Sequence, residues 1–274
     1  MVSIDPNKCV GCSQCVPDCF NHNLKLVDGK MTVKRACMDC GHCVAICPTG
    51  AVSISDYPPQ PLYDYDPKLM NIDPTNLLRF IQFRRSCRRF QDRPVEKEKL
   101  DMMVQAGRFT ATGGNLQDVS YVIVQEQLQT LRPMVWEGLH SITEPAARGE
   151  LADVDPTAVN YADLWRRCYE KYQRDPNNPN NDVIFFNAPA IIIVKSELAH
   201  HAQLAASNVE LMAYAQGLAC LYTGFLRRGI VYGEQAREFL HITGKENMLC
   251  MLVGYPVQKY RRTVPRKEAN ALWL

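Results

Sequence analysis

The sequence has no long hydrophobic run and no strong excess of one charge. Its longest strongly apolar stretch, 188–194, is far shorter than the roughly 20 apolar residues of a membrane-spanning helix. The first residues, MVSIDPNK, lack the basic-then-apolar pattern of a secretory signal. The formal net charge of +2 gives no electrostatic reason to expect nucleic acid or an anionic membrane as a partner. We therefore expect a soluble, cytoplasmic protein with neither of these partners.

Two kinds of chemical motif are also missing. No G-x-G-x-x-G follows an expected strand, so the dinucleotide fingerprint of a Rossmann fold is absent. No motif places a nucleophile beside an acid/base pair. We therefore expect no catalytic side chain, and chemistry supplied by a bound group instead.

Cysteine, in contrast, is abundant, and its spacing is regular. Eight of the twelve cysteines form two copies of C-x2-C-x2-C-x3-C, and a proline follows the second copy. The two copies are an internal repeat, which consists of Cys9, Cys12, Cys15 and Cys19, then Cys37, Cys40, Cys43 and Cys47.

This spacing is typical of iron-sulfur clusters. Zinc usually takes two cysteine pairs separated by a longer loop, and a disulfide framework suits a small secreted chain; the repeat has neither form. Residues 2–55 resemble a bacterial ferredoxin domain with two [4Fe-4S] clusters, in which the fourth cysteine of each run ligates the other cluster. The ligand sets are then Cys9, Cys12, Cys15 and Cys47 for the first cluster, and Cys19, Cys37, Cys40 and Cys43 for the second.

We expect two domains joined by a proline-rich linker. Residues 1–56 form the iron-sulfur domain, with a hairpin around Asp28 and Gly29 and a short helix after each cysteine run. Prolines in 57–70 prevent a helix or a sheet ladder there, so this segment is the linker. Residues 71–274 are long enough for a second domain with a full core.

Helical and strand patterns mix irregularly in the second domain, which favours an α+β fold over a doubly wound sheet. A helix capped by Asp73 or Thr75 carries Leu77, Leu78 and Ile81 on one face. The other expected helices are 94–108, 127–140 and 199–217, and the expected strands are 121–125, 184–195 and 248–255. Residues 143–182 indicate an excursion from the core; their aromatic residues leave open whether this segment packs into the core or covers a site.

Three further elements point to a second cofactor. The first is the run from Arg84 to Phe90, in which four guanidinium groups surround Ser86. Arginine matches phosphate oxygens bidentately, although a basic cluster alone is usually solvated surface. The second is the loop 112–117, where glycines permit close backbone approach and Asn115 and Gln117 offer amides. The third is the basic stretch around Arg266.

In this order the three elements resemble the flavin-binding elements of the nitroreductase family, over about 71–274. The resemblance implies an α+β sandwich that forms a tight homodimer, with FMN at the dimer interface. By position, Arg84, Ser86 and Arg266 would hold the FMN phosphate, with Arg85 and Arg88 beside it. The ribityl chain and ring would meet Thr112, Gly113, Asn115 and Gln117, and backbone N–H groups of Thr223 and Gly224 would donate to flavin N5.

The sequence departs from the family pattern at a few positions. Thr112 follows alanine where proline-serine is usual, and Asp118 and Val119 replace proline-tryptophan. His200 and His201 stand where many relatives carry an acidic residue, and we expect them to be capping or surface residues. The four cysteines outside the repeat are expected to pack as small apolar side chains.

Together the two halves predict an FMN-dependent oxidoreductase. Electrons would pass from a low-potential donor through both clusters to FMN, and on to a small conjugated acceptor of the nitroaromatic or quinone type. The donor would be a ferredoxin- or flavodoxin-like protein or NAD(P)H, in a cell that is anaerobic. Two alternatives stay open: an electron-transfer subunit that docks on a larger redox complex, and a nitroreductase driven directly by NAD(P)H.

Overall fold

The chain folds into two compact units with an α+β mixture of elements, as expected. A computed structural model describes residues 1–35, 37–244 and 246–274. The first unit combines Met1–Asn71 with Thr112–Leu116, and the second combines Ile72–Ala111 with Gln117–Leu274. A short loop from the middle of the chain therefore belongs with the N-terminal unit.

The first unit contains two small antiparallel sheets, β1 with β4 and β2 with β3. In the β2–β3 hairpin Val27 pairs with Lys30, and Asp28 and Gly29 turn the chain with φ of 48° and 73°, as an Asp-Gly hairpin turn requires. The hairpin prediction is confirmed. The expectation that prolines prevent a helix in 57–70 was wrong at the end of that segment, because Pro67 occupies the first position of α2, where a proline is tolerated. The elements of this unit are β1 Val2–Ile4, β2 Leu24–Val27, β3 Lys30–Val33, α1 His42–Ala45, β4 Val52–Ile54, α2 Pro67–Met70 and the 3-10 turn η1 Gly113–Asn115.

The expectation of a short helix after each cysteine run was wrong. Among the described residues of this unit, the helix near the runs is α1, and it lies inside the second run. The segments 20–23 and 48–51, which lead into β2 and β4, contain turns and no helix.

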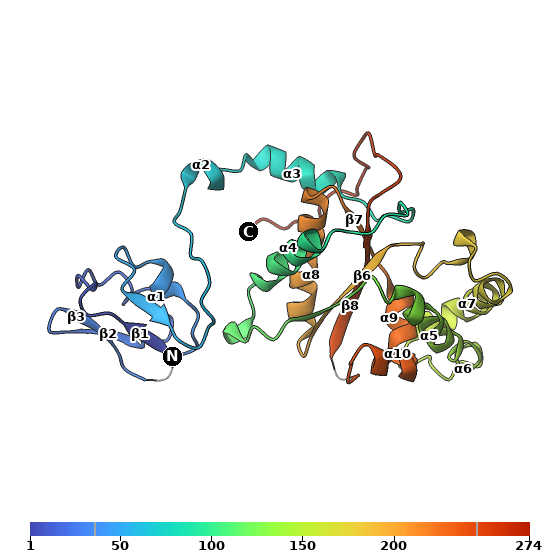
Figure 1. Cartoon of the computed structure of the whole chain (residues 1–274), viewed down its shortest axis with the longest axis horizontal. Helices are drawn as coiled ribbons and strands as arrows, with labels where there is room; N and C mark the ends of the chain where they lie inside the picture. The colour runs from blue at the N-terminus through green and yellow to red at the C-terminus, as the bar shows by residue number, and fades with distance from the viewer. Residues whose placement is uncertain (36, 245) are drawn as a thin grey trace. The chain divides into compact units, whose positions relative to one another are not determined.

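The second unit is built on a four-stranded sheet of order β5-β6-β8-β7, in which all neighbours are antiparallel. In Figure 1, α4 and α8 cover one face of the sheet, whereas α5, α9 and α10 cover the other. The elements are α3 Pro74–Phe83, α4 Lys97–Arg108, β5 Ser120–Val124, α5 Leu128–His140, α6 Thr143–Ala147, α7 Pro156–Arg174, η2 Pro179–Asn181, β6 Ala190–Ser196, α8 Ala199–Ala215, β7 Ala219–Tyr222, α9 Gly224–Tyr232, α10 Glu234–Phe239 and β8 Asn247–Gly254.

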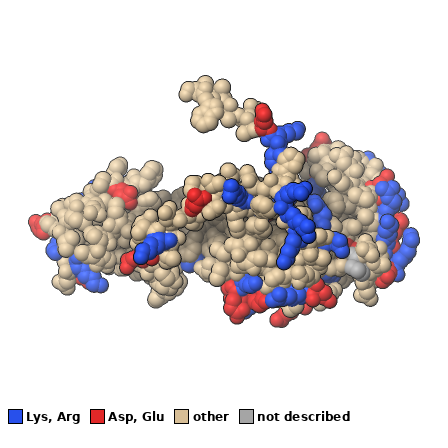
Figure 2. Space-filling model, turned by 90° about the horizontal axis from the view of Figure 1, so that it is seen from above, with Lys and Arg blue, Asp and Glu red and all other residues tan. Residues whose placement is uncertain are grey.

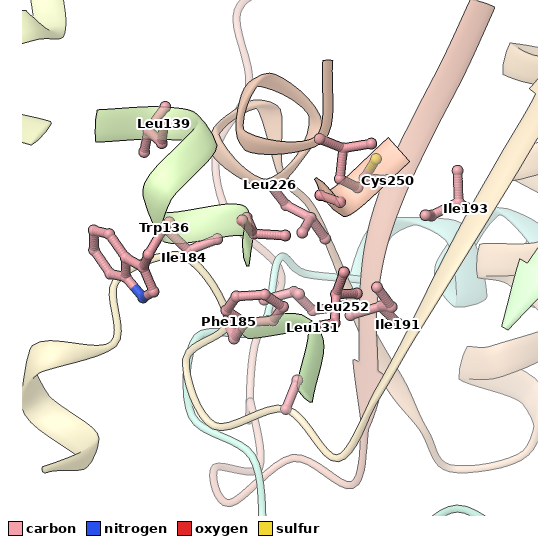
Figure 3. Close-up of a cluster of buried hydrophobic side chains, with 14 of the residues drawn as sticks. Leu131, Trp136, Leu139, Ile184, Phe185, Ile191, Ile193, Leu226, Cys250 and Leu252 are labelled. Atoms are coloured by element: carbon pink, nitrogen blue, oxygen red, sulfur yellow. The ribbon is translucent and has the colours of Figure 1, made fainter. Parts of the chain in front are cut away.

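The strand β6 shows why this sheet needs helices on both faces. Its alternating residues enter two different cores: Ile191 and Ile193 pack with α5 and α9, whereas Ile192 and Val194 pack with α4 and α8. Successive side chains of a strand point to opposite faces, so a strand buried on both sides reads as a continuous apolar run. Figure 3 shows the first of these cores around Leu131, Phe185 and Leu252.

Most expected elements of the second unit are confirmed, and two differ at their starts. Asp73 caps α3 by accepting from the Asn76 amide at 2.7 Å. The strand expected from residue 184 begins only at Ala190, because Pro189 has no N–H for the ladder. The helix expected from residue 94 begins at Lys97.

The segment 143–182 is part of the core and not an excursion from it. Trp165, on α7, is 1% exposed and belongs to the core that also holds α5 and α9. Arg228 of α9 donates to both carboxylate oxygens of Asp155, at 2.7 and 2.8 Å, which ties down the start of α7. The end of the segment is held by an ion pair between Arg132 and Asp182.

No helix within the described ranges is both long and apolar enough to cross a membrane.

Candidate cofactor sites

The first cysteine set lines a single hollow in the N-terminal unit. Cys9, Cys12, Cys15 and Cys47 all border it, together with residues of the 10–14 loop. The first three cysteines of the first repeat therefore lie beside Cys47, the last cysteine of the second repeat. This is the arrangement expected when the fourth cysteine of each run ligates the other cluster.

The second set is built around α1. Cys43 is buried, and its pKa is raised to about 11, first by burial and then by the nearby thiols of Cys37 and Cys40. Cys19 packs on the same small core as Cys37. His42, the histidine inside this run, is exposed and lies 3.3 Å from Asp18 through Nδ1, which agrees with a surface role.

The surroundings of the sulfur atoms fit iron-sulfur clusters. Backbone N–H groups of Asn23, Asp39 and Ala51 donate to the Sγ atoms of Cys19, Cys37 and Cys47, at 3.2, 3.4 and 3.3 Å. The N–H groups of Met31 and Gly11 lower the pKa of Cys9. Such bonds stabilise the thiolate ligand and tune a cluster's potential.

A site for a single metal ion would need at least three ligating side chains close together. In the ranges that the structure describes, no three His, Cys, Asp or Glu side chains are grouped so as to hold one metal ion.

A cavity in the second unit gathers the arginines expected at a phosphate. It has a volume of about 480 Å³, and its lining includes Arg84, Arg85, Ser86 and Arg266. Figure 2 shows Lys and Arg side chains gathered over the larger unit. The expected partner Arg88 is exposed and does not line the cavity. Residues from both ends of the second unit thus meet in one basic hollow.

The arginine run is held in place by its backbone. Cys87 is 1% exposed, and its N–H donates to the carbonyl of Cys220 in β7 at 3.0 Å. Phe90 forms a bridge with Pro256, just beyond β8. The run is thus fixed to β7 at Cys87 and to the chain just beyond β8 at Phe90, and the cavity residues Arg84, Arg85 and Ser86 directly precede the first of these anchors.

Arg84 combines a charge partner with an unused donor. Its Nη1 pairs with the carboxylate of Glu210, a buried residue of α8. Its Nε is buried and has no hydrogen-bond partner among the described residues. A buried N–H without an acceptor is costly, so an anion in this cavity would satisfy it. A phosphate group therefore fits the site.

Sequence reasoning missed Glu210 and Tyr222, which also line the cavity. Burial, followed by the charge of Glu210, raises the pKa of Tyr222. The sequence did contain an indication of the role of Glu210, because it lies four residues after Ala206 and three before Ala213, on the buried face of α8. A charged residue at such a position needs a partner, and here the partner is Arg84.

The loop 112–117 is divided between the two units, because Thr112–Leu116 belongs to the first and Gln117 to the second. Gly114, Asn115 and Gln117 have left-handed φ values of 58°, 57° and 49°. The structure therefore does not place Thr112, Gly113 or Asn115 in the same unit as the basic cavity.

The segment expected near flavin N5 forms the junction of β7 and α9. Thr223 is the N-cap of α9, and its own N–H already donates to the carbonyl of Cys250 at 3.0 Å. Gly224 is the first residue of α9, and first-turn N–H groups have no acceptor within their helix. Of the two expected donors, the geometry favours Gly224.

Two departures from the family pattern form one contact. His201 is 1% exposed, and its Nδ1 lies 2.7 Å from Oδ1 of Asp118. The hydroxyl of Ser196 donates to the same carboxylate. The expectation that His201 is a capping or surface residue was wrong: the N-cap of α8 is Leu198, and the buried ring of His201 has a partner in Asp118, which is distant in sequence. His200 is exposed.

Comparisons with known proteins identify the family of each part of the chain. The model of the nitroreductase family matches residues 81–255, and that of a 4Fe-4S dicluster domain matches residues 1–48. No curated protein matches the chain.

Solved structures share the fold of the second unit at low sequence identity. An FMN-bound nitroreductase from Bacteroides fragilis is 16% identical, with a TM-score of 0.52, and the match covers 72% of this chain and 97% of that one. An FMN-bound nitroreductase from Desulfitobacterium hafniense is 20% identical, with a TM-score of 0.51 and the same coverage. A BluB-like flavoprotein from Clostridium difficile is 16% identical, with a TM-score of 0.50, covering 70% and 94%. The chain therefore belongs to the nitroreductase family, as an FMN-dependent oxidoreductase with a 4Fe-4S dicluster domain at its N-terminus.

Proposed function

We propose that the chain transfers electrons from an external low-potential donor through its two [4Fe-4S] clusters to FMN, for the reduction of a small nitroaromatic or quinone-type acceptor. The observation that carries the proposal is the basic cavity, which brings Arg84, Arg85 and Ser86 together with Arg266. It lies in the same chain as two complete four-cysteine sets. When bound, the clusters supply single-electron transfer, and FMN supplies the change to two-electron chemistry.

The cavity residues hold the flavin phosphate in this proposal. Arg84, Ser86 and Arg266 bind the phosphate oxygens, with Arg85 beside them, because guanidinium groups match a phosphate in geometry and charge. Glu210 orients Arg84 through its Nη1 and leaves Nε for the ligand. Arg88, which lies outside the lining, contributes charge from a greater distance.

The rest of the flavin is held by backbone groups and by the 112–117 loop. The N–H of Gly224 donates to N5, where the positive end of α9 favours electron-rich states of the ring. Thr112, Gly113 and Gln117 contact the ribityl chain and ring. No side chain acts as an acid, a base or a nucleophile.

A homodimer completes the site. Leu77, Leu78 and Ile81 of α3 are 43%, 54% and 40% exposed, so the apolar face predicted for this helix is not covered within the chain. A second copy would bury it. The donor is a ferredoxin- or flavodoxin-like protein or NAD(P)H, and the setting is the cytoplasm of an anaerobe. Light scattering of the pure protein tests the dimer.

The decisive experiment uses protein purified without oxygen. We expect about eight irons and one FMN per chain, and we expect the dithionite-reduced protein to be reoxidised by a nitroaromatic or a quinone alone. Zinc in place of iron, or no flavin, would refute the proposal. If the reduced protein is stable until a protein partner is added, the chain is an electron carrier. Reduction of FMN by NADH or NADPH with the clusters absent would favour the direct nitroreductase.

A further inference from the structure

Asn115, in the loop expected to contact the flavin, is bound to the backbone beside the second cluster. Its Nδ2 lies 3.0 Å from the carbonyl oxygen of Met38, 3.1 Å from that of Asp39 and 3.1 Å from Oη of Tyr57. The Tyr57 hydroxyl in turn donates to the Asp39 carbonyl at 2.8 Å. An amide nitrogen has only two protons, so this network uses its donor capacity fully.

The network reaches a cluster ligand through one residue. Met38 and Asp39 stand between Cys37 and Cys40, and the N–H of Asp39 donates to Sγ of Cys37 at 3.4 Å. Asp39 therefore accepts a hydrogen bond from Asn115 through its carbonyl oxygen, and it donates one through its N–H to a cysteine sulfur of the second set. Asn115 also has a φ of 57°, a left-handed conformation that asparagine tolerates better than most residues.

The matching position in the first repeat is covered differently. There, Gly11 packs so closely on the hairpin turn that an added Cβ would lie 2.4 Å from the carbonyl oxygen of Gly29. Lys30 also donates to the Cys9 carbonyl, at 2.6 Å. The first run is therefore closed by its own hairpin, whereas the corresponding loop of the second run accepts a segment from the middle of the chain. The two repeats are alike in sequence, but within the described ranges the hydrogen bonds of the Asn115 side chain go to the second run and not to the first.

We propose that Asn115 is a positioning residue, which fixes the flavin-contacting loop on the 37–40 loop and so makes the second cluster the one that reduces FMN. The first cluster then receives electrons from the external donor. The proposal rests on the proposed function. With the groups bound, the clusters would supply two electrons singly, and FMN would take them up with two protons from solvent.

The main variant is Asn115→Asp, with Asn21→Asp as the matched control. Aspartate keeps the shape and tolerates the left-handed backbone, but it has no N–H and repels the two carbonyl oxygens. Asn21 also contacts Met38, through Nδ2 at 3.5 Å from Sδ, but it lies within the iron-sulfur domain and does not involve the 112–116 loop. Tyr57→Phe removes one member of the network without changing the loop itself.

Three measurements separate the possible roles. Hydrogen–deuterium exchange compares peptides covering 37–43 and 112–117. Flavin content is measured after gel filtration. Flash photoreduction of the clusters, followed by flavin absorbance, gives the rate of internal transfer.

We expect Asn115→Asp to increase exchange in both peptides and to slow internal transfer at least about tenfold, since small displacements have large effects on rate. Because the 112–117 loop is itself expected to contact the flavin, FMN content and the direct reduction of FMN by dithionite are measured in the same samples, and internal rates are compared at equal flavin loading. Tyr57→Phe should show a smaller slowing, and Asn21→Asp none. Lys30→Met, beside the first cluster, should slow reduction by an external protein donor without changing the internal rate.

Wild-type transfer in Asn115→Asp would overturn the proposal. Loss of FMN with unchanged exchange in 37–43 would also overturn it, because Asn115 would then act only as a flavin contact. If the wild-type protein holds iron but no FMN, the proposed function fails, and so does the proposal that the second cluster reduces FMN. The exchange data would still show whether Asn115 anchors the loop.

Discussion

The two units are stabilised in different ways. The small core of the first consists of Val2, Cys15, Leu24, Met31, Cys43 and Val52, so expected metal ligands are among its buried residues. The cores of the second unit are built from aliphatic and aromatic side chains on both faces of one sheet. A unit of the first size buries too little apolar surface to be stable alone, whereas the second unit needs no metal to complete its core. We therefore expect metal-dependent folding in the first unit and metal-independent folding in the second.

The largest effect should follow from removing iron. Chelation under reducing conditions should unfold the first unit, because metal binding supplies its folding free energy, and should leave the second unit folded. All three tryptophans, Trp136, Trp165 and Trp273, belong to the second unit, so their fluorescence should not change. Hydrogen exchange should rise in peptides from 1–71 and stay low in β6 and β8. Simultaneous unfolding of both units would show that the second also depends on the clusters.

The next largest effect should come from the core of the second unit. Trp165→Ala should lower the free energy of unfolding by about 3–5 kcal/mol, because it leaves a large cavity. Trp165→Phe is the matched control: Nε1 of Trp165 has no partner within the described ranges, so no hydrogen bond is lost, and the smaller cavity should give a smaller loss than in the alanine variant. Urea titration followed by circular dichroism measures both, and iron content should equal that of the wild type. A small loss for the alanine variant would mean that 143–182 is not a true part of the core.

Arg84 and Arg88 test whether the cavity, and not charge in general, holds the flavin. Arg84→Ala should weaken FMN binding by about 10- to 150-fold, as expected for the loss of a charge-assisted hydrogen bond of about 1.5–3 kcal/mol. Arg88→Ala removes the same charge outside the lining and should change affinity by only a few-fold. Fluorescence titration of flavin-free protein gives both constants. Equal losses of FMN affinity in the two variants would indicate that net positive charge, and not the cavity, holds the flavin. The iron content should equal that of the wild type in both variants.

Local sequence patterns were sufficient to predict much of the fold. Asp28 and Gly29 determine a hairpin by their own turn conformation, and Asp73 caps α3 across three residues. The cysteine spacing was likewise sufficient to predict that Cys47 would meet the first run. In each case the interaction is local, or the repeat itself contains the information.

The remaining features depend on contacts between distant segments, which no local pattern contains. Buried Glu210 has Arg84 as its partner, and buried His201 has Asp118, whose Oδ1 accepts a hydrogen bond from Nδ1 of the ring. Asn115 belongs to the first unit, although Gln117, two residues later, belongs to the second. Polar residues at otherwise apolar positions indicated that partners must exist, but only the fold shows which partners they are.

The smallest effect should come from the buried contact of Asp118 in the second unit. Burial opposes its ionisation, but hydrogen bonds from Ser196 and His201 outweigh this and hold the pKa of Asp118 below its usual value. A carboxyl whose pKa is lowered in the folded state stabilises the fold above its unfolded pKa, near 3.9, and this contribution is lost as pH falls through the folded value. Asp118→Asn should therefore lower the free energy of unfolding by about 1–2 kcal/mol near neutral pH, and the difference should shrink below about pH 4.

Tryptophan fluorescence during urea unfolding reports this difference for the second unit alone, even where acid damages the clusters. His200→Ala, at the exposed neighbour of His201, serves as the control and should match the wild type. A difference for Asp118→Asn that persists unchanged into acid would mean that packing of the side chain, and not its charge, stabilises this corner. In that case the second unit would owe its stability to apolar burial even more completely than the comparison with the metal-dependent unit already implies.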